Sequence, residues 1–143
     1  MKIRFEIEEG VIGWWWRTVR KRHVVVWVGE VAGEYGKEVG EINYRFCSRG
    51  RMLTLNQRWL GHNYDTDVIT FDYSEGTVVS GDIAIGVETV RENAKEVGVP
   101  FENELLRVMI HGVLHLCGLK DKTRKEKVEM RLAEEQALEA WAS

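Results

Sequence analysis

Residues 101–117 constrain the fold most, because apolar side chains lie almost all the way round a helix of that span. A helix that is hydrophobic on every side is buried. This one carries His111 and His115, and a spacing of four residues places both imidazoles on one helical face. Burying two imidazoles requires a partner for each ring nitrogen. The segment therefore predicts a buried central helix whose two histidines share a binding partner.

A glycine and an aspartate after the histidines make a metal ion the favoured partner. Gly118 ends the helix, because glycine accepts the left-handed conformation of a C-terminal cap. The chain reversal brings Asp121 back under the histidines, in the pattern H-x-x-x-H-x-x-G-x-x-D. We predict His111, His115 and Asp121 as the ligands of one Zn²⁺ ion. Three protein ligands leave a coordination position open, as in catalytic zinc sites.

The residues alone leave two other interpretations of the histidines open. Two histidines and one carboxylate also form the facial triad of non-haem iron enzymes. Core histidines bonded to backbone carbonyls would have the same spacing. A metalloprotease does not fit, since those enzymes place a glutamate general base after the first histidine, where this chain has Gly112. Cys117 falls off the histidine face and is not predicted as a ligand.

The rest of the chain predicts four strands and about five helices. Alternating apolar residues predict strands over 2–8, 41–47, 68–73 and 81–87. Helical periodicity predicts helices over about 18–35, 49–60, 90–97, 101–117 and from 123 onward. This order predicts a single α+β domain over residues 1–143, with a small mixed four-stranded sheet packed with the helices and the metal site on the buried central helix.

Caps and inward-facing residues are also predicted. Ser48 is the expected cap of the helix over 49–60, and Thr123 with Glu126 forms a capping box. We expect three side chains of each of two helices to face the core, namely Met52, Leu55 and Trp59, and Val128, Leu132 and Trp141. The segment 24–28 has the composition of a strand but also fits a helical stripe, which we favour. We assign no structural role to the three tryptophans at 14–16.

Composition narrows the setting and the partners. No apolar run reaches the roughly 20 residues that span a bilayer, and the N-terminus lacks a secretory pattern. Two cysteines make no disulfide framework, so we expect a cytoplasmic protein without a membrane partner. Residues 1–60 carry 11 Lys+Arg against 7 Asp+Glu, which is compatible with a polyanionic partner but far from a non-specific nucleic-acid binder.

Three motifs resemble those of a known family. Residues 111–118, H-G-V-L-H-L-C-G, are similar to the signature H-G-x-L-H-L-x-G-Y-D-H of the YbeY family of rRNA-maturation endoribonucleases. Residues 55–71, from L-N to T-D-V-I-T-F, resemble the family's L-N…T-D-V-L-S-F, and S-G-D-I at 80–83 resembles its G-D-I strand. The similarity spans about residues 40–135, whereas the first 20 residues match poorly.

The resemblance implies a zinc-bound endoribonuclease of the bacterial cytoplasm that is specific for single strands. It also implies work in 16S rRNA 3′-end maturation and ribosome quality control. The implied partners are rRNA or other single-stranded RNA, the ribosome and ribosome-associated proteins, and no DNA is expected. We predict hydrolysis of a phosphodiester by a metal-activated water.

The chain departs from the family pattern at two positions. The family's third ligand is usually histidine, and this chain has Asp121, which is a competent zinc ligand. The family usually has an arginine linked with RNA handling where this chain has Leu60. Arg58 is the candidate substitute, so His111 and Arg58 are the predicted catalytic residues. Leu60 favours one alternative, a metal-stabilised rRNA- or ribosome-binding factor with little catalysis; a metallohydrolase acting on other phosphoesters or amides is another.

Other polar residues receive weaker predictions. Candidates for contacts with the RNA backbone, which carry no sequence information, are Arg49, Arg51 and Arg58. Asp65 or Asp67 could act as a base or orient a ligand histidine, and loop capping is the alternative for both. His62 is a candidate to approach the metal from its loop. His23 and Cys47 are interpreted as structural.

Overall fold

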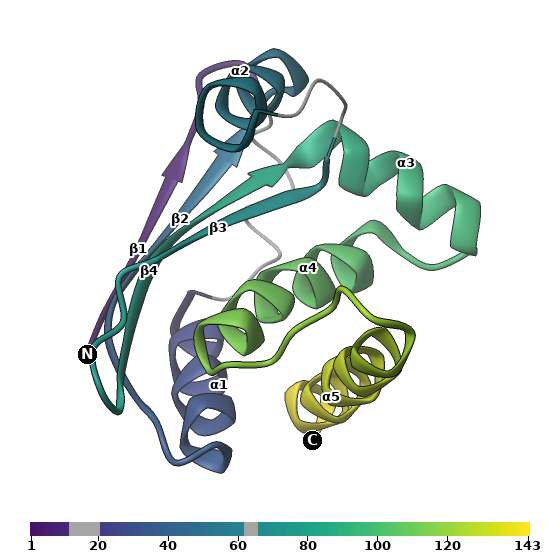
Figure 1. The fold of residues 1–143 in the computed structure, drawn as a ribbon. Coiled ribbons are helices and arrows are strands. Elements are labelled where there is room, and N and C mark those ends of the chain that lie inside the picture. Colours follow the sequence, from purple (N-terminus) through teal and green to yellow (C-terminus); the bar gives the residue numbers. More distant parts are fainter. Residues whose placement is uncertain (12–20, 62–65) are drawn as a thin grey trace.

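A computed structural model describes residues 1–11, 21–61 and 66–143, which form one four-stranded sheet and five helices (Figure 1). The strands are β1 (Lys2–Ile7), β2 (Glu38–Cys47), β3 (Val68–Asp72) and β4 (Val78–Gly86). The helices are α1 (Lys21–Glu34), α2 (Arg49–Leu60), α3 (Val87–Val97), α4 (Phe101–Leu116) and α5 (Arg124–Ala142). The predicted α+β fold with a small mixed sheet is confirmed.

The sheet has the order β1-β2-β4-β3, which leaves β1 and β3 at its edges. Strand β2 pairs in parallel with β1 and β4, and β3 runs antiparallel to β4. Because successive side chains of a strand point to opposite faces, the sheet needs a cover on each side. Helices α1 and α4 cover one face, and α5 packs on α4 (Figure 1).

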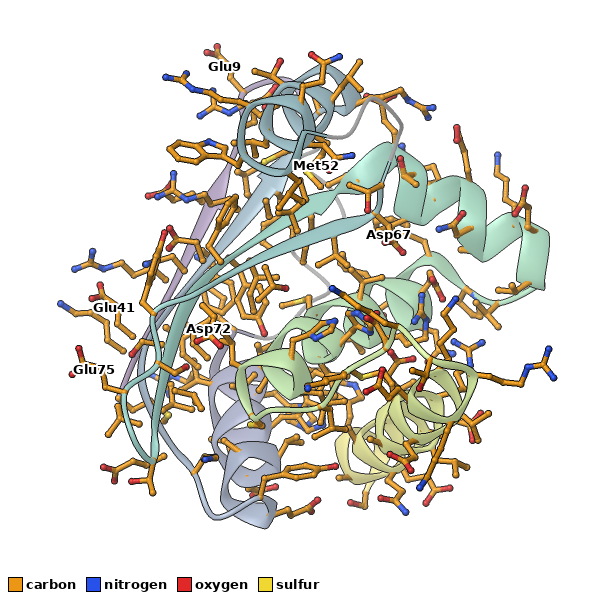
Figure 2. The ribbon with its side chains drawn as sticks, in the orientation of Figure 1. Glu9, Glu41, Met52, Asp67, Asp72 and Glu75 are labelled. Carbon is orange, nitrogen blue, oxygen red and sulfur yellow. The ribbon has the colours of Figure 1, made fainter. Side chains whose placement is uncertain are left out.

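Helix α2 covers part of the other face. Its Met52 points toward the sheet (Figure 2) and joins a small second core with Cys47, Ile69 and Ala84. The predicted cap of α2 is confirmed, since the hydroxyl of Ser48 accepts a hydrogen bond from the amide of Arg51. The sheet therefore has an α4 side and an α2 side, which meet at the edge strand β3.

The central helix α4 is buried as predicted, from Leu105 to Leu116, apart from the face that carries the histidines. Two long-range hydrogen bonds fix its surroundings: the Tyr44 hydroxyl donates to the carbonyl of Met109, and the Trp27 indole donates to the carbonyl of Ala137. The second bond ties α1 to α5. Residues 24–28 are helical, because Trp27 and its neighbours face this core.

Three predicted core residues are exposed instead. Trp59 is 62% exposed at the edge of the sheet, where its indole contacts Phe71 of the edge strand β3 edge-on. Val128 and Leu132 face solvent, and α5 instead presents Met130, Ala133, Glu134 and Ala137 inward, which are the buried residues of that helix. Small side chains allow α5 to lie close to α4. Trp141 is half-buried against Trp27, and the predicted Thr123–Glu126 capping box is confirmed.

Within the described ranges, no helix is both long and apolar enough to cross a membrane. Both cysteines are buried free thiols. The tryptophans at 14–16 lie outside the described residues.

Candidate metal centre

The end of α4 is shaped by a glycine-dependent turn. Gly118 has a φ of 104°, and two backbone hydrogen bonds close the helix, from the amide of Gly118 to the carbonyl of His115 and from Leu119 to Leu114. This is the Schellman arrangement, in which a residue with positive φ reverses the chain. The reversal returns Leu119 and Asp121 to the histidine face of the helix, as the sequence predicted.

The three predicted metal ligands lie together. One carboxylate oxygen of Asp121, Oδ2, is 3.3 Å from Nε2 of His111 and 3.3 Å from Nε2 of His115. The two imidazole rings are nearly perpendicular, with their centres 4.6 Å apart. Among the residues that the structure describes, these three form a group with one ligand atom each within 4.8 Å of the others. They could therefore hold one metal ion.

The other nitrogen of each ring has a partner of its own. Nδ1 of His115 lies 3.0 Å from the carbonyl oxygen of Leu119, and Nδ1 of His111 lies 2.6 Å from Oε2 of Glu134. A carbonyl only accepts, so His115 carries its hydrogen on Nδ1, and an ionised Glu134 imposes the same tautomer on His111. When the rings are neutral, both Nε2 lone pairs then face Asp121. Two neutral imidazoles and an ionised carboxylate bring three acceptors together, which is the chemistry of a cation site.

A buried charge network stands behind His111. Glu134 is only 2% exposed, and its second oxygen, Oε1, accepts from Arg107 at 3.0 Å. Arg107 also donates to Glu104 at 2.9 Å and approaches Asp67 at 3.8 Å. Burial raises the pKa of Glu134, but the hydrogen bonds and charges of His111 and Arg107 outweigh burial and hold that pKa below its usual value. Glu134 therefore stays ionised and orients His111.

The ligand atoms open into a cleft of about 560 Å³ beside the edge strand β3. Its polar lining includes Asp67, Thr70 and Lys122. Figure 2 shows Asp67 on the α4 side of the sheet, and burial raises the pKa of its carboxyl, against the lowering charges of Arg107 and His111. The cleft thus offers a half-buried carboxylate and a lysine beside the three ligands.

Comparison with known proteins identifies the family to which this chain belongs. The family model described as Endoribonuclease YbeY matches residues 17–142. The chain belongs to the YbeY family. Relatives named Endoribonuclease YbeY from Porphyromonas gingivalis and Phocaeicola vulgatus are 52% and 50% identical over 120 residues, which is 84% of this chain and 80% and 87% of theirs. The structure is also similar to the solution structure of TM1509 from Thermotoga maritima, with a TM-score of 0.65 and 26% sequence identity. The match covers 99% of this chain and 92% of the TM1509 chain.

Membership in the YbeY family confirms the resemblance that the motifs predicted. The name shared by the relatives, endoribonuclease, is also the enzyme class predicted from the sequence. The departure at the third ligand is compatible with the site, because the carboxylate of Asp121 reaches both histidines.

The other predicted site residues are spread over the fold. Arg58 lies on α2 with its guanidinium 5.8 Å from the ring centre of Trp59, and it does not line the metal cleft, whereas Leu60 does. Arg49 pairs with Glu88 and Glu92. The ligand histidine is oriented by Glu134, whereas Asp67 approaches Arg107. The catalytic role of Arg58 stays a prediction.

Further candidates are placed as structural residues or lie outside the described ranges. His23 stacks on Trp141, with ring centres 3.8 Å apart, and Cys47 is buried in the second core. Burial raises the pKa of Cys117 to about 11, and the thiol belongs to the main core rather than the histidine face. His62 and Asp65 are outside the residues that the structure describes.

Sequence reasoning missed Glu134, Arg107 and Lys122. Glu134 falls four residues after Met130 and three before Ala137, so an acid occupies the buried stripe of α5. Arg107 likewise interrupts the apolar run of α4. A charged residue at a buried helical position requires a partner. This signal was present in the sequence, but the larger apolar side chains of α5 favoured a different stripe as the inward one.

Proposed function

We propose that this chain is a zinc-dependent endoribonuclease specific for single-stranded RNA. Its predicted task is 16S rRNA 3′-end maturation and ribosome quality control, in association with the ribosome in the cytoplasm. The observation that carries the proposal is the convergence of His111, His115 and Asp121 in a chain of the YbeY family. A Zn²⁺ ion with an open position activates water and polarises a phosphoryl oxygen.

The ligand set supports a divalent metal ion and suits zinc. Asp121 Oδ2 lies 3.3 Å from Nε2 of each histidine, so one ion could contact all three groups. Two imidazoles and one carboxylate, with a position left open, form the ligand set of a catalytic zinc site.

The chain's own residues supply orientation and charge around the scissile phosphate. Glu134 holds the ring of His111, and Leu119 holds that of His115, so both Nε2 atoms stay directed into the cleft. Asp67 is our candidate to accept a proton there, since burial already raises its pKa. Lys122 is placed to contact a phosphate as a cation in the same cleft.

The test measures metal content and cleavage on the same samples. We expect purified protein to carry one zinc per chain and to cleave a single-stranded RNA but not a duplex of the same sequence. Chelation should abolish cleavage, and added Zn²⁺ should restore it. His111→Ala should lose both the metal and the cleavage. Cys117→Ala, a change on the core-facing side of the same helix end, is the matched control and should keep both.

Two results would contradict the proposal. Cleavage that persists unchanged in His111→Ala would come from a contaminating nuclease. Iron in place of zinc, with activity restored only by Fe²⁺, would leave the enzyme class but reject the ion.

One observation favours a second candidate, an RNA-binding factor with little catalysis. Leu60, 48% exposed, lines the cleft at the position where the resemblance implies an arginine. RNA binding without cleavage in the wild type, together with a gain of cleavage in Leu60→Arg, would establish this second function.

A further inference from the structure

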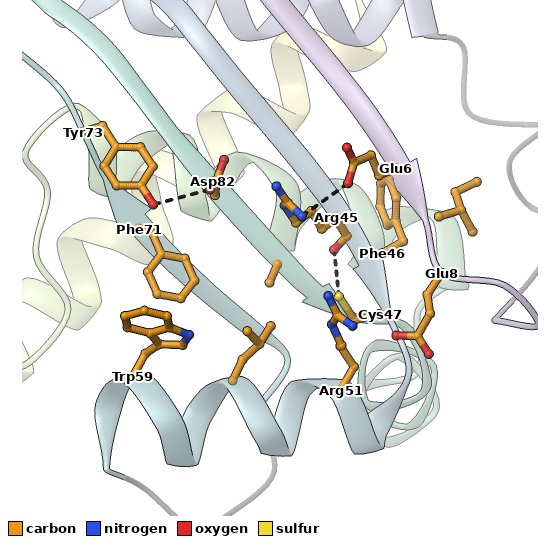
Figure 3. A pocket seen from close by; sticks show the side chains of 13 residues that line it. Glu6, Glu8, Arg45, Phe46, Cys47, Arg51, Trp59, Phe71, Tyr73 and Asp82 are labelled. Atoms are coloured by element: carbon orange, nitrogen blue, oxygen red, sulfur yellow. Dashed lines mark hydrogen bonds and ion pairs between the residues drawn. The ribbon is translucent and has the colours of Figure 1, made fainter.

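A second groove lies on the α2 side of the sheet (Figure 3). It has a volume of about 420 Å³, and its floor comes from all four strands, with α2 as one wall. Trp59, Phe71 and Tyr73 form a row along it (Figure 3). Trp59 and Tyr73 are 62% and 60% exposed. Trp59 meets Phe71 edge-on, with the ring centres 6.4 Å apart. Neither the proposed metal centre nor the packing of the core uses these exposed rings.

The acids of this groove already have partners. Glu6 pairs with Arg45 at 3.4 Å, and Asp82 accepts from the amide of Asn43 at 3.0 Å. A carboxylate oxygen of Glu8 accepts from the backbone amide of Ser48 at 3.3 Å.

Two arginines of the groove are available instead. Arg51 and Arg58 are exposed, and within the described part of the chain their guanidinium groups make no hydrogen bond or ion pair. They stand seven residues apart on α2, so both project from the same side of the helix. Arg51 lines the groove itself, and Arg58 lines the adjoining hollow, which shares Glu8, Arg51, Leu55 and Trp59 with it. Both guanidinium groups thus stand beside the aromatic row without an ion pair among the described residues.

The groove and the metal cleft meet at the edge of the sheet. On β3, the metal cleft is lined by Val68, Ile69, Thr70 and Asp72, and the groove is lined by Phe71. At the end of α2, Trp59 lines the groove and Leu60 lines the cleft. Two separate elements therefore contribute neighbouring residues to both sites, and a chain that leaves one site can enter the other around β3.

We infer that this groove is a second binding site for single-stranded RNA, where bases stack on the row of aromatic rings and Arg51 and Arg58 contact phosphates. The inference rests on the proposed RNA substrate. Exposed aromatic rings beside cations are how proteins bind single strands without reading sequence. The free arginines and the continuity with the metal cleft favour RNA over a protein partner, because an apolar docking surface needs neither.

The test measures RNA binding apart from cleavage. All variants are made in a His115→Ala background, and binding of a labelled 12-nucleotide oligouridylate is followed by fluorescence anisotropy. Trp59→Ala should weaken binding by about 5- to 150-fold, the range that loss of one base stack gives. Trp59→Phe should restore most of it, because a ring is retained. The exposed Leu132→Ala on α5 is the matched control and should bind like the parent.

The dependence of affinity on salt separates stacking from charge. Arg51→Gln with Arg58→Gln should reduce the slope of log affinity against log salt by about 0.7 for each phosphate that the protein no longer neutralises. Arg124→Gln, an exposed arginine on α5, should leave that slope unchanged.

The outcomes distinguish a failure of the groove as an RNA site from a failure of the proposed nuclease function. If Trp59→Ala binds the 12-mer as tightly as the parent, the inference is wrong, and the groove is left as a surface for a protein partner. If the parent binds RNA and depends on Trp59, but the wild type with zinc does not cleave, the groove stands and the nuclease proposal fails. Melting curves should show all variants folded, since Trp59 contributes little to the core.

Discussion

The two faces of the sheet hold their polar side chains in opposite ways. On the α4 face, His111 is fixed by Glu134, and Glu134 by Arg107, with most of these atoms removed from solvent. On the α2 face, Arg51 and Arg58 are exposed, without a hydrogen bond or ion pair among the described residues. A metal ion requires its ligands within a fraction of an ångström, whereas a polymer is bound by groups that can adapt to it.

Because of this contrast, substitutions on the two faces of the sheet should affect different properties of the protein. Changes on the α4 face should alter the stability of the fold and its affinity for metal. Changes of the exposed arginines and aromatic rings on the α2 face should leave both nearly unaltered and act on RNA binding alone.

Arg107→Met should have the largest effect on stability. The change leaves Glu104 and Glu134, which are 5% and 2% exposed, without their main cation. Removing one partner of a buried ion pair costs about 3–5 kcal/mol of the free energy of unfolding. Urea denaturation measures this decrease, with Arg124→Met at the exposed start of α5 as the control. A decrease below about 1 kcal/mol, the usual limit for an exposed pair, would mean that the network is solvated rather than buried.

Glu134→Gln should weaken metal binding while the three ligands stay in place. A neutral amide still reaches Nδ1 of His111 but no longer fixes the ring through a charged hydrogen bond. Loss of such a supporting partner typically costs about 10- to 100-fold in metal affinity. Competition with a chromophoric chelator measures the affinity. The neighbouring Glu135→Gln, on the exposed side of α5, should bind metal like the wild type.

Gly112→Ala should destabilise the fold by about 1–3 kcal/mol, the usual cost of overpacking a core. An added Cβ would lie 2.8 Å from two side-chain carbons of Ile83 on β4. The same contact explains why no glutamate can follow His111 here. Gly33→Ala in α1 meets no atom within 4 Å and should be neutral or stabilising. Combining Gly112→Ala with Ile83→Val should recover part of the stability, and no recovery would place the strain elsewhere.

Asp67→Asn should have a smaller effect that depends on pH. Burial raises the pKa of Asp67 in the folded chain, so the ionised carboxylate disfavours folding at neutral pH. As pH falls through the folded pKa, the native state takes up a proton and this cost disappears. Asp67→Asn should therefore be more stable than the wild type at neutral pH, with the difference narrowing toward acid pH in urea titrations. A less stable variant at neutral pH would mean that the attraction of Arg107 dominates.

The sequence predicts those parts of the molecule whose signals are local. The apolar circumference of α4, the Gly118 turn and the alternation in the strands each depend on neighbouring residues, and each agrees with the structure. The convergence of His111, His115 and Asp121 was also predictable, because one helix and one turn supply all three.

The support for that site was not predictable in the same way, because it depends on how α5 docks on α4. Helical spacing in α5 fits more than one stripe, and the larger side chains of Val128 and Leu132 favoured the wrong one. Close packing of two helices instead selected alanines and Glu134. Trp59 was misplaced for a related reason: its size suggested the core, but its indole lies against Phe71 of the edge strand β3 and stays 62% exposed.

Substitutions of the arginines of α2 should change the free energy of unfolding least. Arg58→Gln and Arg51→Gln should each change the free energy of unfolding by less than about 0.5 kcal/mol, as usual for exposed positions without partners. Arg49→Gln, which breaks ion pairs with Glu88 and Glu92, should cost slightly more, about 0.2–1 kcal/mol. Metal content should stay at one ion per chain in all three variants. If Arg51→Gln or Arg58→Gln destabilised the fold more than Arg49→Gln, these arginines would serve the structure, and the contrast between the two faces of the sheet would fail.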